Sequence, residues 1–195
     1  MGVEFELKYG ANRQQQAAIR QAFSGEEVCY RMQTTYYDTP GGSFSARKCT
    51  LRRRMENDVS ICTLKTPAGG YGRREWEVAC DTIEAAIEEL CKLGAPEDIL
   101  SLAREGLVPI CGARFTRIAK TLCWEDAQLE LALDEGILTG GGREEPLCEV
   151  EVELKSGSRE ACLAFAQDLS RKFGLQLEEN SKFRRALALY KGETL

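Results

Sequence analysis

Two short segments near opposite ends of the sequence alternate strictly between charged and apolar side chains. The first is Glu4-Phe5-Glu6-Leu7-Lys8, and the second runs from Glu149 to Lys155, with acids at every other position up to Glu153. Successive side chains of a β-strand point to opposite faces, so each segment predicts a strand with one ionic and one apolar face. The ionic face lies either in water or in an enclosed polar cavity. We expect both strands to contribute to one site.

The same alternation predicts strands through most of the chain. We expect them over residues 4–8, 28–38, 49–55, 59–66, 71–79, 115–124, 129–138 and 147–155. Turn signals such as Thr39-Pro40-Gly41-Gly42 and Asn57-Asp58 favour antiparallel neighbours. One alternative is an ordinary sheet whose ionic face meets solvent. The other is a barrel whose apolar faces pack outward against helices, while the ionic faces line a charged tunnel.

Helical periodicity predicts five helices between these strands. They cover residues 12–23, 81–94, 96–106, 159–173 and 182–190. Asn12 is the expected cap of the first helix, and Asp81 and Glu84 have the capping-box spacing at the start of the second, which ends at Gly94. Ser158 and Gly174 bound the fourth of them. The predicted fold class is α+β, a closed antiparallel barrel of about eight strands with helices packed outside. We expect one domain over residues 1–195, a length that suits a single hydrophobic core.

The sequence contains no histidine, and this excludes several kinds of active site. A catalytic triad built on histidine, a histidine general base and a histidine-ligated metal are all ruled out. A metal in this protein must therefore bind to carboxylates, which suits Mg²⁺, Mn²⁺ or Ca²⁺.

Charge, cysteine content and hydropathy limit the partners and the compartment. The net charge of -5 argues against a broad nucleic-acid-binding surface. The nine cysteines form no CxxC pair and are scattered, which favours reduced thiols in the cytoplasm. We see no apolar run long enough to span a bilayer and no signal peptide, so we expect no membrane partner.

Eight blocks follow the opening Glu-x-Glu-x-Lys segment in order along the chain. They are Tyr36-Tyr37-Asp38-Thr39-Pro40, Leu51-Arg52-Arg53-Arg54, Leu64-Lys65, Arg73-Arg74-Glu75, Phe115-Thr116-Arg117, Leu131-Ala132-Leu133-Asp134-Glu135-Gly136, Glu149-Val150-Glu151-Val152-Glu153 and Ser181-Lys182. This series resembles the CYTH proteins, also called triphosphate tunnel metalloenzymes, over nearly the whole chain. The segment from Pro146 to Gly157 looks most like the bacterial inorganic triphosphatase branch.

The resemblance implies which residues form the site. The implied ligands of the triphosphate are Lys8, Arg52, Arg54, Lys65, Arg73, Arg117 and Lys182. The implied ligands of one or two Mg²⁺ or Mn²⁺ ions are Glu4, Glu6, Glu149, Glu151 and Glu153. Catalysis is expected to depend on Glu4, Glu6, Lys8 and Glu151.

Several other charged residues have two interpretations. Four acids occupy strand positions whose side chains are expected to face the tunnel: Glu75, Glu77, Glu130 and Asp134. They either orient the cations of the tunnel or form plain salt bridges within the barrel. Arg114 is out of register with Arg117, so we favour Arg117 as the ligand. Arg185 either approaches the tunnel mouth from the last helix or lies on the surface.

The function that the resemblance implies is metal-dependent hydrolysis of inorganic tripolyphosphate to pyrophosphate and phosphate. The same tunnel occurs in family members that are adenylate cyclases, thiamine triphosphatases or RNA 5′-triphosphatases, and these, or a nucleoside triphosphatase, are alternatives. A non-catalytic binder of polyphosphate or nucleotide is a further one. Intact acidic strands favour the hydrolase, because a pure anion binder gains nothing from carboxylates that face its ligand. The oligomeric state is either monomer or homodimer.

Overall fold

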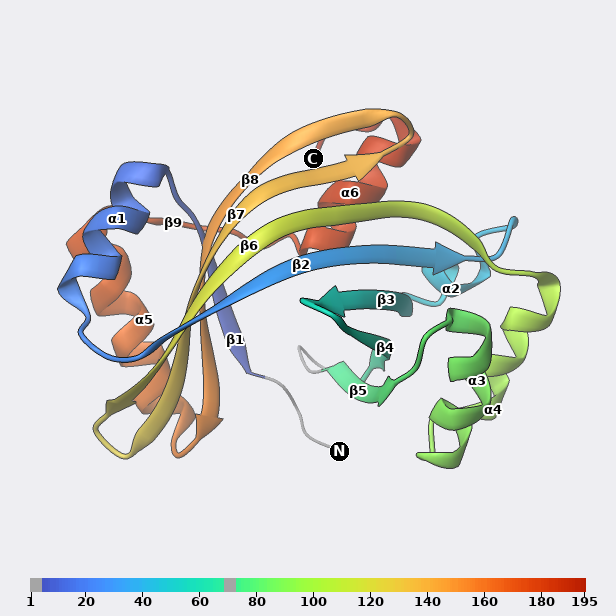
Figure 1. The fold of residues 1–195 in the computed structure, drawn as a ribbon, viewed down its shortest axis with the longest axis horizontal. Coiled ribbons are helices and arrows are strands. Elements are labelled where there is room, and N and C mark those ends of the chain that lie inside the picture. The colour runs from blue at the N-terminus through green and yellow to red at the C-terminus, as the bar shows by residue number, and fades with distance from the viewer. Residues whose placement is uncertain (1–4, 69–72) are drawn as a thin grey trace.

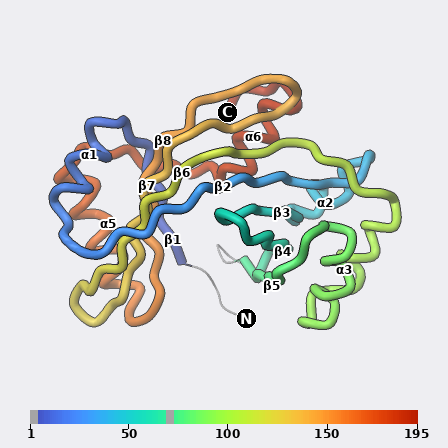
Figure 2. Tube along the Cα trace, viewed as in Figure 1, coloured from blue at the N-terminus to red at the C-terminus, as the bar shows by residue number. Residues whose placement is uncertain are grey.

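The computed structural model describes residues 5–68 and 73–195, and its described strands form one nine-stranded antiparallel sheet (Figure 1). The order across the sheet is β5-β4-β3-β2-β6-β7-β8-β1-β9. The strands are β1 (Glu6–Gly10), β2 (Glu27–Asp38), β3 (Thr50–Glu56), β4 (Val59–Pro67), β5 (Arg73–Ala79), β6 (Val108–Trp124), β7 (Ala127–Gly140), β8 (Arg143–Ser156) and β9 (Gln176–Leu177). The long strands β2, β6, β7 and β8 arch across the whole molecule, as the chain trace in Figure 2 also shows.

Strand register places the charged side chains on one face of this sheet, which we call the ionic face. Residues directly opposite each other in a ladder point the same way. On β1, β6, β7 and β8 the opposite pairs are Lys8↔Glu151, Glu6↔Glu153, Asp134↔Glu149 and Arg117↔Asp134. On β2 to β5 they are Tyr36↔Arg52, Thr34↔Arg54 and Lys65↔Glu75. The ionic face therefore extends from β1 to β5 as the alternation predicted, with apolar side chains such as Met32 and Phe115 between its two charged groups.

The sheet is strongly curled, but the predicted closure into a barrel is not seen. No ladder joins β5 to β9 in the part of the chain that the structure describes. The order of nine strands also exceeds the expected eight, because the two-residue strand β9 pairs with β1 and caps that edge. The observed architecture is an α+β fold built on a curled, open antiparallel sheet.

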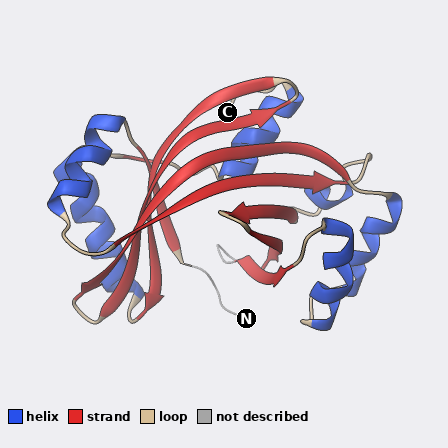
Figure 3. Ribbon diagram, in the orientation of Figure 1, coloured by secondary structure: helices blue, strands red, loops and turns tan. Residues whose placement is uncertain are grey.

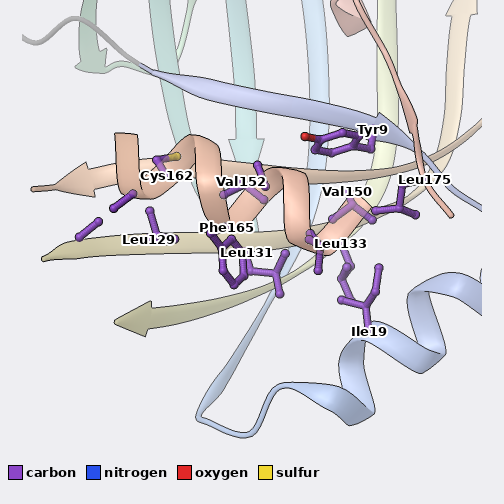
Figure 4. Packing of buried hydrophobic residues seen from close by; sticks show 14 residues of the cluster. Tyr9, Ile19, Leu129, Leu131, Leu133, Val150, Val152, Cys162, Phe165 and Leu175 are labelled. Atoms are coloured by element: carbon purple, nitrogen blue, oxygen red, sulfur yellow. The ribbon is translucent and has the colours of Figure 1, made fainter. Parts of the chain in front are cut away.

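Two helices cover the apolar face at the β1 end of the sheet. They are α1 (Arg13–Ala22) and α5 (Arg159–Phe173), and Figure 4 shows the core between α5 and the strands. Leu131, Val150, Val152 and Phe165 are at most 2% exposed there. Asn12 and Ser158 cap the two helices as predicted, and Gly174 ends α5 in the left-handed conformation.

A second group of helices covers the apolar face of β3–β5. It consists of α2 (Ser43–Ala46), α3 (Ile83–Lys92), α4 (Glu97–Leu100) and the 3-10 helix η1 (Ser101–Glu105). The segment predicted as one helix after Pro96 is thus two short ones. Thr82, and not Asp81, caps α3, because the Thr82 hydroxyl accepts the hydrogen bond from the Ala85 amide. Neither α2 nor β9 was predicted, since both are too short to show a period.

The last helix, α6 (Lys182–Lys191), lies against the long strands (Figure 3). Its contacts place it on the ionic side of the sheet rather than outside it. Its Ala186 and Phe183 join a core with Met32, Phe115 and Leu147, whose side chains share the register of the ionic face. A Cβ at Gly140 would collide with the α6 backbone at Ala186 and Tyr190. This close approach places the start of α6 over the charged side chains.

Candidate active site

Three buried carboxylates meet on the ionic face at the centre of the long strands. Asp134 on β7 and Glu149 and Glu151 on β8 each offer an oxygen within 4.8 Å of the others. Asp134 and Glu149 lie opposite each other in the ladder, and both are fully buried. Three carboxylates in such proximity repel one another, so they require cations to remain ionised.

Lys182 and Arg117 supply this positive charge. The Nζ of Lys182 lies 2.8 Å from Asp134 Oδ2 and 2.7 Å from Glu151 Oε1, and it also donates to Glu149 Oε1. Arg117 donates two hydrogen bonds to Asp134, of 2.8 and 2.7 Å, and a further one to Glu151. Both predicted phosphate ligands are thus bound to acids in this structure.

Arg185 is a member of this cluster that the sequence left undecided. Its Nη1 donates to Glu149 Oε2 at 3.0 Å, and its Nη2 donates to Glu145 at 2.7 Å. Only 14% of the side chain is exposed, so the surface interpretation is wrong. The spacing of three residues from Lys182 is the signal that places both side chains on one face of α6.

The pKa values in the cluster follow from burial and charge. Burial raises the pKa of Glu149, and the nearby Lys182 opposes that rise incompletely. Burial also acts to raise the pKa of Glu151, but Lys182 and Arg117 outweigh it and hold that pKa well below its usual range. Burial acts to lower the pKa of Lys182, and the three acids raise it far above the ordinary value. The three acids therefore favour the charged form of Lys182.

Strand β1 adds a charged pair beside the cluster. The Nζ of Lys8 donates to Glu6 Oε1 at 2.9 Å, and the neighbouring Glu6 and Glu151 raise the pKa of Lys8 despite its burial. Glu6 lies opposite Glu153, which pairs with Lys155 at 2.8 Å. Glu4, the first acid of the predicted metal-binding set, lies outside the described residues.

The other half of the ionic face is cationic. On β3 and β4, Arg52 and Lys65 lie 3.6 and 3.1 Å from oxygens of Glu75. Arg54 pairs with Glu56, yet burial and the neighbouring Arg52 lower the pKa of its guanidinium. Its Nε is buried without a hydrogen-bond partner among the described residues. Glu56, Glu75 and Glu77 lie among these cations, and Glu56 and Glu77 oppose the fall in the Arg54 pKa.

Arg73 lies at the margin of this cationic half. Its Nη2 donates to the Lys48 carbonyl at 2.9 Å and to Thr50 Oγ1 at 3.1 Å. Its register on β5 is that of Glu75, so it shares the ionic face.

The charged side chains of the ionic face are enclosed rather than solvated. Lys8, Arg52, Arg54, Lys65, Arg117 and Lys182 expose between 11% and 18% of their side chains. Long cationic side chains are seldom buried unless an anion accompanies them. The arrangement can therefore bind a polyanion beside a carboxylate cluster that suits a hard divalent cation.

The opposite face of the sheet provides an internal comparison. Arg114 faces away from the cluster, pairs with Glu144 at 3.3 Å, and leaves 59% of its side chain exposed. Arg53, between the two inward arginines of β3, donates to Ser60 on that same outer side. The predicted register of Arg114, out of step with Arg117, is confirmed.

Comparison with known proteins identifies relatives of this chain. A family model of the CYTH domain matches residues 2–187. An inorganic triphosphatase from Haemophilus influenzae is 29% identical over 159 residues, which cover 80% of this chain and 45% of the relative. The chain thus spans about half the length of the curated relative it matches.

Solved structures share the fold at low sequence identity. An adenylyl cyclase candidate from Hippeastrum, described as having a dominant triphosphatase activity, has a TM-score of 0.68 at 20% identity, covering 98% of this chain and 97% of its own. A Pyrococcus horikoshii protein has a TM-score of 0.63 at 22% identity, covering 94% and 98%. Among the described residues, no helix is both long and apolar enough to cross a membrane.

Proposed function

The chain belongs to the CYTH domain family, and on this premise we propose that it is a metal-dependent triphosphatase that hydrolyses inorganic tripolyphosphate to pyrophosphate and phosphate. The observation that carries the proposal is the division of one enclosed ionic face into a cationic half and a carboxylate cluster. The inorganic triphosphatase of Haemophilus influenzae supports the same substrate class.

The cations of the ionic face would bind the phosphate chain. Arg52 and Arg54 present guanidinium forks that match pairs of phosphate oxygens, while Lys8 and Lys65 act as point charges. Their partial burial strengthens each interaction, because less water competes with the phosphate. Arg73, Arg117 and Lys182 complete the proposed set, the last two after exchanging carboxylate partners for phosphate oxygens.

The acidic cluster fits the metal that the family implies. Asp134, Glu149 and Glu151 offer hard oxygen donors within 4.8 Å of one another, which is the kind of donor that Mg²⁺ and Mn²⁺ prefer. We propose these three as ligands, with Glu4, Glu6 and Glu153 as the further acids of the site. When bound, such an ion supplies Lewis-acid charge and activates water for attack on phosphorus.

Residues of the chain perform the remaining work. The cationic half would hold the terminal phosphorus in line with the attacking water and stabilise the charge that develops on the leaving pyrophosphate. Glu75 would keep Arg52 and Lys65 oriented toward the substrate. The carboxylate cluster distinguishes this proposal from a pure polyphosphate binder, for which buried acids beside the ligand would weaken affinity.

Phosphate release from a substrate panel tests the proposal. We expect the protein with Mg²⁺ or Mn²⁺ to convert tripolyphosphate to equal amounts of pyrophosphate and phosphate, faster than it cleaves ATP or thiamine triphosphate. Arg54→Gln should raise KM for tripolyphosphate at least tenfold, and Arg53→Gln on the outer face serves as the matched control. Formation of cyclic AMP from ATP as the main reaction, or equal effects of both substitutions, would contradict the proposal.

A further inference from the structure

The ammonium of Lys182 occupies the middle of the acidic cluster. It contacts all three carboxylates, with Nζ 2.8 Å from Asp134 and 2.7 Å from Glu151, and it also donates to Glu149. Hydrogen bonds join the ammonium to Glu149 and Glu151, and a salt bridge joins it to Asp134. Arg117 reaches Asp134 and Glu151, and Arg185 reaches Glu149, each from one side of the cluster.

A divalent ion held by these oxygens would need the same space. Mg²⁺ lies about 2.0–2.1 Å from its oxygen ligands, and the three oxygens of this cluster are within 4.8 Å of one another. An ion among them would lie next to the Lys182 nitrogen, and the two positive charges would repel strongly in this buried setting. The space among the three carboxylates can therefore hold either the Lys182 ammonium or a metal ion, but not both.

Lys182 can leave the cluster without moving its helix. It is the first residue of α6, directly after the Ser181 cap, and its four-carbon stem is flexible. The helix itself is anchored further along, where Ala186 packs against Gly140. The ring of Phe183 lies 5.0 Å from that of Tyr36, which is opposite Arg52 in the ladder. The start of α6 thus borders the cationic half.

From these contacts we infer that Lys182 is a built-in substitute for the metal. It neutralises the acidic cluster in the metal-free protein, competes with the divalent ion, and is released when phosphate oxygens offer it another anionic partner. The inference rests on the proposed function for the identity of that partner. It makes metal and tripolyphosphate binding cooperative, because each removes an obstacle to the other.

The binding of Mn²⁺ alone tests this inference. Free Mn²⁺ is measured by electron paramagnetic resonance in the absence of tripolyphosphate, for the wild type, Lys182→Met and Lys182→Gln. We expect at least tenfold tighter Mn²⁺ binding in both variants. Gln retains hydrogen-bond donors for the carboxylates, so it preserves the fold if Met does not. Arg184→Gln removes the same charge from an exposed position of α6 and should leave the affinity unchanged.

The outcomes separate the inference from the proposed function. Unchanged or weaker Mn²⁺ binding in a folded Lys182→Gln protein would overturn the inference, even if the wild type hydrolyses tripolyphosphate. Tighter binding in that variant supports the inference, even if the wild type releases no phosphate. If Mn²⁺ affinity increases by the same factor in Lys182→Gln and Arg184→Gln, the increase is a general effect of net charge, and this result would also overturn the inference.

Discussion

Arg117 and Asp134 lie directly opposite each other on β6 and β7, and the guanidinium donates two hydrogen bonds, of 2.8 and 2.7 Å, to the carboxylate. Asp134 is fully buried, so its negative charge is stabilised by Arg117 and Lys182 instead of by water. By contrast, Arg54 on β3 pairs with Glu56, and burial and the neighbouring Arg52 lower the pKa of its guanidinium. The two arginines share a face, but their pKa values shift in opposite directions.

This contrast predicts opposite effects on stability. Arg117→Met leaves the Asp134 carboxylate buried with one partner fewer, which should lower the free energy of unfolding by about 3 kcal/mol. Arg54→Met removes a guanidinium whose pKa is lowered by burial and by Arg52, so the melting temperature should stay the same or rise. Urea unfolding of both variants measures this, and a large loss of stability in Arg54→Met would contradict the assigned environment.

The position of α6 should control activity from a distance. Gly140→Ala places a Cβ against the backbone of Ala186 and Tyr190, so the helix must shift away from the sheet. Because Lys182 and Arg185 are both on α6, we expect tripolyphosphate turnover to fall at least tenfold. Circular dichroism should show the same strand content as the wild type. Wild-type turnover in this variant would show that the placement of α6 does not matter.

The sequence predicted well on which face of the sheet each strand residue lies. It predicted neither the open sheet nor the packing of α6 on the ionic face. A period of two fixes which side chains share a side, and this is why Arg52, Arg54 and Lys65 fall together while Arg53 and Arg114 do not. Barrel closure depends on long-range curvature, which alternation does not encode. The apolar periodicity of the helix that carries Lys182 and Arg185 predicts that the helix packs on a sheet. It does not predict which face of the sheet the helix packs on.

Acid should weaken the attachment of α1 through Glu27. Hydrogen bonds from Arg20 and Lys120 lower the pKa of Glu27 to about 2, from 4.5. A lowered pKa in the folded state means that this ion pair contributes stability above pH 4.5 and loses it as pH falls toward 2. Glu27→Gln should therefore be less stable than the wild type at pH 7, with the difference shrinking below pH 4.5. Glu26→Gln is the control, and a difference that is independent of pH would contradict this assignment.

Cysteine reactivity should divide by burial. Burial raises the pKa of Cys62 to about 11 and that of Cys111 to about 12, so their thiolates are scarce at pH 8. Cys29 and Cys123 are exposed. Brief iodoacetamide treatment of the folded protein, followed by mass spectrometry, should modify the exposed pair at least tenfold faster. Equal labelling of all four would show that the buried thiols are open to solvent.

A crystal structure with Mn²⁺ and a non-hydrolysable tripolyphosphate analogue tests the central claim most directly. We predict an anomalous manganese peak bound by Asp134, Glu149 and Glu151, with Lys182 withdrawn from them and phosphate oxygens within hydrogen-bond distance of Arg52 and Arg54. Manganese and analogue bound on the outer face near Arg114, or an acidic cluster still filled by Lys182 with the analogue in place, would contradict it.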